Sequence, residues 1–178
     1  MIVVLMGVTA SGKTTIGRKL AAKLGWEYAE GDDYHSEANK QKMHRGIPLT
    51  DEDRAPWLVS LHDVLMGWYR SGKSGVLACS ALKQTYRDAL SAGIPKEALR
   101  FVLLEVPRPI LERRLAERRN HYMSPALLDS QIGTLELPKD AIRVRGDLPP
   151  DEVVHQIIAA IGAHEGRPGE SRPNESRP

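Results

Sequence analysis

A glycine-rich stretch near the amino end decides the fold: residues 7–14 read Gly7-Val8-Thr9-Ala10-Ser11-Gly12-Lys13-Thr14. They match the pattern G-x-x-x-x-G-K-[ST] at every fixed position. In that pattern, backbone N–H groups and the start of the following helix bind phosphate oxygens, Lys13 reaches the β- and γ-phosphates, and the Thr14 hydroxyl binds Mg²⁺. The sequence therefore predicts a nucleoside triphosphate site formed by residues 7–14 and Thr15, with Thr14 as a metal ligand.

The segments around this loop have the pattern that such a site requires. An apolar run precedes it, and a helical pattern with Ile16, Leu20 and Leu24 on one face follows it. Farther along, strand-like runs alternate with helical patterns. We expect strands at 2–6, 27–30, 75–79, 100–105 and 141–145, and further helices at about 36–45, 51–71, 83–90, 109–119, from 125, and through 153–161. This alternation predicts a three-layer α/β fold with a five-stranded, mostly parallel sheet.

Length and composition limit the classes of protein to consider. The chain has 178 residues, of which 41% are hydrophobic and 27% charged, as in a single globular domain. Its formal net charge is only +2, so we expect neither a nucleic-acid partner nor membrane binding. No apolar run reaches the ~18 residues that span a bilayer. One cysteine, Cys79, fits a reducing compartment, and we expect a cytoplasmic protein.

The carboxyl end differs from the rest of the chain. Arg-Pro recurs at 167–168, 172–173 and 177–178, with Gly, Glu, Ser and Asn between the repeats. These residues offer nothing that can bury apolar surface. We therefore predict one domain over residues 1–164 and a disordered tail over 165–178.

An acidic turn, Gly31-Asp32-Asp33-Tyr34-His35, follows the second expected strand. In open α/β sheets, the ligand crevice lies at the carboxyl ends of the strands. A carboxylate there can lie near Mg²⁺ and accept the proton of a substrate hydroxyl, so we predict Asp32 as catalytic base and metal ligand. Aspartate also favours turns and helix caps, which leaves a structural role open. His35 is either a substrate contact or an ordinary loop histidine.

A phosphate loop alone does not name a reaction. GTPases usually read guanine with N-K-x-D, whereas the Asn-Lys pair of this chain continues as Asn39-Lys40-Gln41-Lys42. ATPase motors usually end an apolar strand with a metal-binding aspartate, whereas two of the expected strands end at Cys79-Ser80 and Glu105. These features favour a small-molecule kinase over the other two classes.

Three blocks of the chain resemble the gluconokinase family. They are the acidic turn with Asn39, Lys42-Met43, Gly46-Ile47-Pro48-Leu49, Asp51, Asp53-Arg54 and Pro56-Trp57-Leu58; Cys79-Ser80-Ala81-Leu82-Lys83 with Tyr86-Arg87-Asp88; and Arg119-Asn120-His121-Tyr122-Met123 with Leu127-Leu128, Ser130-Gln131 and Leu135-Glu136-Leu137-Pro138. The resemblance implies ATP- and Mg²⁺-dependent phosphorylation of D-gluconate to 6-phosphogluconate. It also implies a shikimate-kinase-like P-loop fold, a mobile helical lid at about 118–138, and often a homodimer. The chain departs from the family at Ala10, where glycine is frequent, and at Ser36, Tyr122 and Ile132.

A polyhydroxy carboxylate needs cations for its carboxylate and paired donors and acceptors for its hydroxyls. With the resemblance as a guide, we expect Arg54 and Arg87 to bind these groups and Lys42 to assist. Ser80 and Lys83 are further candidates just beyond a strand end. Each charged residue has an alternative role as a solvated surface charge or ion pair.

The helix expected at 109–119 carries several arginines. Phosphoryl transfer spreads negative charge over the equatorial oxygens, and an arginine near them stabilises the transition state. Arg113 and Arg114 cannot share one helix face with all the others, and by position we favour Arg118 and Arg119 as catalytic residues. Two other functions stay open: a kinase for shikimate or another sugar acid, and a nucleotide-binding regulatory module without an acceptor. Trp57 is expected to be a packing residue.

Overall fold

The structure is a computed structural model that describes residues 1–117 and 125–165. The two arginines favoured for catalysis, Arg118 and Arg119, lie outside the described residues. The first part of the expected lid and residues 166–178 of the expected tail also lie outside them. Helix α7 (Pro150–Glu165) includes the residue at which the tail was expected to begin.

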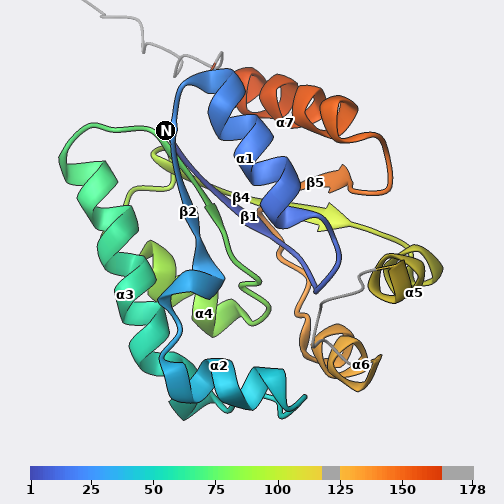
Figure 1. The fold of residues 1–178 in the computed structure, drawn as a ribbon. Helices are drawn as coiled ribbons and strands as arrows, with labels where there is room; N and C mark the ends of the chain where they lie inside the picture. Colours follow the sequence, from blue (N-terminus) through green and yellow to red (C-terminus); the bar gives the residue numbers. More distant parts are fainter. Residues whose placement is uncertain (118–124, 166–178) are drawn as a thin grey trace, which may run out of the picture.

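The predicted α/β fold is confirmed. Five strands form one sheet in the order β2-β3-β1-β4-β5, and each neighbouring pair is parallel (Figure 1). The strands are β1 (Ile2–Met6), β2 (Glu27–Glu30), β3 (Gly75–Ala78), β4 (Leu99–Glu105) and β5 (Ile142–Arg145). The central strand β1 is buried along its whole length, because helices cover both faces of the sheet. Since the strands are parallel, their carboxyl ends meet at one edge.

Helices form the two outer layers. On one face, α1 (Lys13–Leu24) and α7 lie side by side and bury Leu20 and Ile157 against the sheet. On the other face, α3 (Asp51–Arg70) and α4 (Gln84–Ser91) bury Leu61 and Leu90. No helix in the described ranges combines the length and apolar character that crossing a bilayer demands.

The remaining helices lie toward the carboxyl edge of the sheet. They are the 3₁₀ helix η1 (Gly31–Tyr34), α2 (Glu37–His44), α5 (Arg108–Glu117) and α6 (Pro125–Thr134). Figure 1 shows α2, α5 and α6 at the end of the sheet toward which the strands run. This arrangement surrounds the strand ends with loops and short helices, where α/β folds bind their ligands.

Two residues beside the sheet are buried. Trp57 on α3, which the sequence assigns to packing, is 2% exposed, and Cys79, which follows β3, is 1% exposed. Burial raises the pKa of the Cys79 thiol to about 12, so the thiol stays protonated and does not act as a nucleophile.

Candidate active site

A cavity of about 90 Å³ lies at the carboxyl edge of the sheet. The phosphate loop, the end of β2, the segment after β3, and helices α3 and α6 all contribute to it. Its lining residues are Thr9, Ala10, Gly12, Lys13, Thr14, Thr15, Glu30, Asp32, His35, Met43, Leu49, Arg54, Ser80, Leu127 and Gln131. The phosphate loop and the acidic turn, which are separate in the sequence, therefore meet in one place.

The phosphate loop depends on glycine at both of its fixed positions. Gly7 has φ 144°, and a Cβ there would lie 3.1 Å from the carbonyl oxygen of Leu104. Gly12, which precedes the first turn of α1, has φ 102°. Only glycine adopts such angles without strain. Lys13 Nζ turns back along the loop and donates to the carbonyl oxygens of Gly7 and Val8, at 3.0 Å each.

Ala10 is the position of the loop at which the family often has glycine. Its φ is 61°, which lies in the left-handed region. For a residue with a Cβ this conformation costs about 1 kcal/mol. Alanine in place of glycine therefore introduces local backbone strain into the loop, at a residue that lines the cavity.

The acidic turn brings one of its two aspartates to the cavity. Gly31 lies so close to β3 that a Cβ there would be 2.6 Å from the carbonyl oxygen of Ala78. Glycine therefore lets the chain pass close to β3 at the point where β2 ends and η1 begins. Asp32 then lines the cavity with the phosphate loop, whereas Asp33 lines a separate surface hollow that includes Arg18.

His35 is a buried polar residue on the wall of the cavity. It is 6% exposed, and its ring stacks on Trp57 at 4.4 Å between centroids. Trp57 Nε1 donates to the carbonyl oxygen of Gly31 at 2.7 Å, which fixes the stack on the acidic turn. Burial lowers the pKa of His35 to about 4, so the ring is neutral near pH 7. Its Nδ1 is buried without a hydrogen-bond partner in the part of the chain that the structure describes.

Arg54 is the cation of α3 that reaches the cavity. Its guanidinium lies over the Tyr86 ring at 5.6 Å, and Nε donates to the carbonyl oxygen of Leu49 at 3.5 Å. Within residues 1–117 and 125–165, no carboxylate forms an ion pair with Arg54. The guanidinium therefore keeps donors for an anionic ligand.

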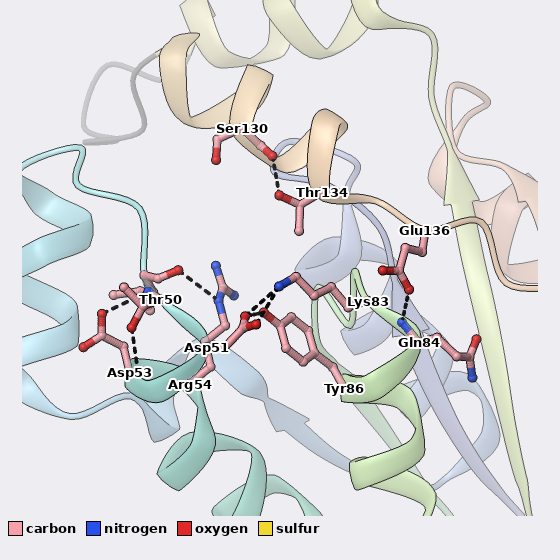
Figure 2. A network of polar contacts seen from close by, with 11 residues as sticks. Thr50, Asp51, Asp53, Arg54, Lys83, Gln84, Tyr86, Ser130, Thr134 and Glu136 are labelled. Atoms are coloured by element: carbon pink, nitrogen blue, oxygen red, sulfur yellow. Dashed lines mark hydrogen bonds and ion pairs between the residues drawn. The ribbon is translucent and has the colours of Figure 1, made fainter.

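Lys83 also lies over the Tyr86 ring and is already paired. Its Nζ is 5.4 Å from the Tyr86 centroid and donates to both carboxylate oxygens of Asp51, at 2.8 and 2.7 Å. The Tyr86 hydroxyl also donates to Asp51. Both contacts lower the pKa of the Asp51 carboxyl, Lys83 more than Tyr86. Figure 2 shows this network below Ser130 and Thr134 of α6.

The structure does not bring Lys42 or Arg87 to the cavity. Lys42 Nζ donates to both carboxylate oxygens of Asp53, at 2.7 and 2.8 Å. Arg87 is 2% exposed, and its Nη1 donates to the carbonyl oxygens of Ala81 and Leu82 at 2.9 and 3.0 Å. Arg87 therefore holds the segment after β3, and it lines a different cavity of about 880 Å³.

Two polar residues near the phosphate loop were not expected to act there. Gln131 of α6 lines the cavity, and its Oε1 accepts a hydrogen bond from the Thr9 N–H at 2.7 Å. Arg114 of α5 donates to the carbonyl oxygens of Ala10 and Ser11, at 3.3 Å each. Neither contact has a signal in the sequence, because each depends on where a helix far along the chain docks.

The donor set at the cavity fits Mg²⁺ together with a nucleotide. Thr14 supplies an exposed hydroxyl, and Asp32 supplies a carboxylate in the same cavity. Mg²⁺ is typically held by one or two carboxylates together with substrate phosphates and water. The described residues contain no group of three or more His, Cys, Asp or Glu side chains that could hold a metal. A magnesium ion here would therefore need phosphate oxygens as further ligands.

Comparisons with known proteins agree with this geometry. Residues 2–138 match the family model described as an AAA domain. The gluconokinase of Gluconobacter oxydans (strain 621H) is 45% identical over 166 residues, which is 91% of this chain and 92% of the relative. The crystal structure of a gluconokinase from Sinorhizobium meliloti 1021 has a TM-score of 0.80 at 38% identity, covering 90% of this chain and 91% of that one. Shikimate kinase from Aquifex aeolicus vf5 shares the fold, with a TM-score of 0.60 at 18% identity over 93% of this chain and 98% of that one.

Proposed function

The chain belongs to the gluconokinase family, and we propose on that basis that it transfers the γ-phosphoryl group of ATP to D-gluconate. The products are 6-phospho-D-gluconate and ADP. One observation carries the proposal: the phosphate loop, Asp32 and Arg54 line the same cavity. A regulatory nucleotide-binding module would need the loop alone, whereas this cavity also holds a carboxylate base and a cation for an acidic acceptor.

On the donor side, the backbone N–H groups of the loop and the start of α1 bind the phosphates. Lys13 places its ammonium group at the β- and γ-phosphates. Thr14 and Asp32 would hold Mg²⁺, which when bound neutralises charge on the phosphate oxygens. These groups orient the terminal phosphate toward the acidic turn.

On the acceptor side, Asp32 accepts the proton of the terminal hydroxyl of gluconate. The hydroxyl oxygen bonds to the γ-phosphorus as the bond from that phosphorus to the bridging oxygen breaks, and the electron pair leaves with ADP. Arg54 binds the carboxylate by charge-assisted hydrogen bonds. His35 and Ser80 offer neutral polar atoms to the hydroxyls between these two ends of the substrate.

Three properties of the protein complete the proposal. We infer a requirement for Mg²⁺, a cytoplasmic location and a homodimer, each supported by membership of the family. A metal titration of activity tests the first, cell fractionation the second, and light scattering of the purified chain the third. Arg118 and Arg119 stay proposed as transition-state arginines, tested by their replacement with glutamine.

A panel of acceptors tests the activity. ADP release from ATP is measured with D-gluconate, shikimate and other sugar acids, and without acceptor. We expect gluconate to raise ADP formation far above the acceptor-free rate, with 6-phosphogluconate as the product by mass spectrometry. Stimulation by a different acid with none by gluconate would overturn the assignment of the acceptor. ATP binding without turnover on any acid would indicate a regulatory module.

A further inference from the structure

We propose that Gln131 competes with the terminal phosphate of ATP: its carboxamide oxygen occupies, on the Thr9 N–H, the place that a γ-phosphate oxygen takes in the complex. The inference rests on the proposed function, because it assigns a role within the same phosphate site. It adds a neutral residue from α6 to a donor site that the sequence pattern confines to the loop. It also predicts how the site distinguishes ATP from ADP.

The hydrogen bond between Thr9 and Gln131 is short, and its direction follows from the chemistry of the two groups. The Thr9 backbone N–H donates to Gln131 Oε1 at 2.7 Å, across 122 positions of the sequence. Only the oxygen of a carboxamide accepts a hydrogen bond, so the orientation of the side chain follows from its partner. The Nε2 group, which carries two donors, is therefore the branch that does not bind the loop amide at Thr9. Thr9 is 6% exposed, so Gln131 satisfies an amide that water reaches poorly.

The position of Lys13 indicates that the Thr9 N–H faces the terminal (γ) phosphate of a bound nucleotide. In this type of loop the lysine reaches the β- and γ-phosphates. Lys13 Nζ lies against the carbonyl oxygens of Gly7 and Val8, which immediately precede Thr9. The helix end of the loop, at Thr14 and beyond, serves the phosphates nearer the nucleoside. An acceptor on the Thr9 N–H therefore occupies the region of the terminal phosphate.

Helix α6 does not need Gln131 for its position. Leu128 of α6 is 1% exposed within a cluster of buried apolar side chains. Asp129 pairs with Arg108 of α5 at 2.7 Å. After the helix ends, Glu136 accepts a hydrogen bond from the Gln84 N–H at 2.6 Å. The Gln131 side chain can therefore leave the Thr9 amide while the helix stays docked on its neighbours.

The arrangement makes Gln131 a competitor of ATP but not of ADP. A triphosphate brings an oxygen to the Thr9 N–H and displaces the carboxamide oxygen. A diphosphate leaves the region at Thr9 free, so the hydrogen bond to Gln131 persists. Because the carboxamide is neutral, it does not repel the phosphate, whereas a carboxylate of the same size would.

Calorimetric titrations of the full chain with Mg²⁺ and either ADP or a non-hydrolysable ATP analogue test this role without any acceptor. For Gln131→Leu we expect the affinity for the ATP analogue to rise about five-fold, because one competing hydrogen bond is removed. For Gln131→Glu we expect that affinity to fall about ten-fold, because the added charge faces the γ-phosphate. The ADP affinity should stay within about two-fold in both variants. Asp129→Asn, which removes a different contact of α6, is the matched control and should change neither affinity.

The proposal is overturned if the two Gln131 variants change both affinities by one common factor, as a purely structural role would, or if neither affinity changes. The two opposite shifts keep the test decisive even where one variant is less stable. Gluconate is absent throughout, so the result does not depend on the acceptor. A shifted ratio of the two affinities together with no phosphorylation of gluconate would support the role of Gln131 and reject the proposed function.

Discussion

The two sides of the cavity present different chemical groups: the donor side, which binds ATP, uses the backbone, and the acceptor side, which binds gluconate, uses side chains. The donor side is one run of consecutive residues that presents backbone N–H groups, with glycines at the angles that the turn requires. The acceptor side is made of side chains from η1, α3 and the segment after β3. Several charges on that side are already paired within the protein: Asp51 with Lys83, and Asp53 with Lys42.

This difference shows which groups remain for a substrate. In the loop, the Ser11 N–H donates to the carbonyl oxygen of Val8 and the Thr9 N–H donates to Gln131. These are hydrogen bonds between neutral groups, and a phosphate forms stronger, charge-assisted bonds in their place. Side chains can pair with one another, and an ion pair that is already formed contributes little to a new ligand. On the acceptor side, we therefore expect Asp32, His35, Arg54 and Ser80 to be the groups left for gluconate, and the predictions below test this division.

The largest effect is expected at the base. Asp32→Asn should lower kcat with gluconate about a thousand-fold, because an amide cannot accept the hydroxyl proton. Binding of an ATP analogue should persist, since the loop is unchanged. The neighbouring Asp33→Asn is the matched control and should leave kcat within about two-fold, because Asp33 lies in a separate hollow. Steady-state kinetics of both variants test this prediction. Equal losses of kcat would contradict the claim that only Asp32 acts as the base.

A large effect on stability, not on substrate binding, is expected at Arg87. Arg87→Met leaves the buried carbonyl oxygen of Ala81 without its donor, while that of Leu82 keeps the Glu136 N–H, and should lower the free energy of unfolding by about 2 kcal/mol. Chemical denaturation measures this change. The control, Lys96→Met, replaces an exposed cation of the same 880 Å³ cavity and should have an effect below about 0.5 kcal/mol. If Arg87→Met is as stable as the unmodified protein but has a raised KM for gluconate, Arg87 binds the substrate and the prediction is wrong.

A smaller effect, on substrate binding alone, is expected at Arg54. Arg54→Gln should raise the KM for gluconate about thirty-fold, because charge-assisted hydrogen bonds to the carboxylate are lost. The KM for ATP should change little. Lys42→Gln, which removes a cation paired with Asp53, is expected to change the KM for gluconate by no more than about two-fold. If Lys42→Gln has the stronger effect, the pairing seen in the structure breaks when substrate binds.

The buried histidine on the acceptor side makes the stability of the protein depend on pH. Burial lowers the pKa of His35 from 6.5 to about 4. Between these values the unfolded chain binds a proton that the folded chain does not, so this group lowers the stability as pH falls, by about 1.4 kcal/mol per pH unit. His35→Phe keeps an aromatic ring against Trp57 and should flatten this part of the profile between pH 6.5 and 4. Denaturation at several pH values is the measurement, and identical slopes for both proteins would show that His35 titrates normally.

The smallest effect is expected on the donor side. Ala10→Gly removes the strain of a left-handed alanine but gives the unfolded chain more freedom, so we expect a gain of about 0.5 kcal/mol in stability. The contrasting variant is Ala22→Gly, on the exposed face of α1, which should lose about 1 kcal/mol. Thermal denaturation resolves the two signs. A loss at both positions would mean that the loop carries no relievable strain at Ala10.

The sequence by itself determined the donor side and the fold class. The loop is recognised from consecutive residues, because its function depends on backbone angles that glycine sets locally. The strands followed from apolar runs, and their bounds lie within one residue of the expected ones. Asp32 could be chosen because it follows a strand, and parallel strands all end at one edge of a sheet.

Only the tertiary structure decided the use of the remaining side chains. Arg54 and Arg87 are equivalent candidates by sequence, yet one lines the cavity and the other is buried against carbonyl oxygens. Gln131 reaches the phosphate loop because α6 docks there, although 122 positions separate it from Thr9. The physical reason is that hydrogen bonds and ion pairs act over a few ångströms, so the role of a polar side chain depends on neighbours that only the folded chain provides.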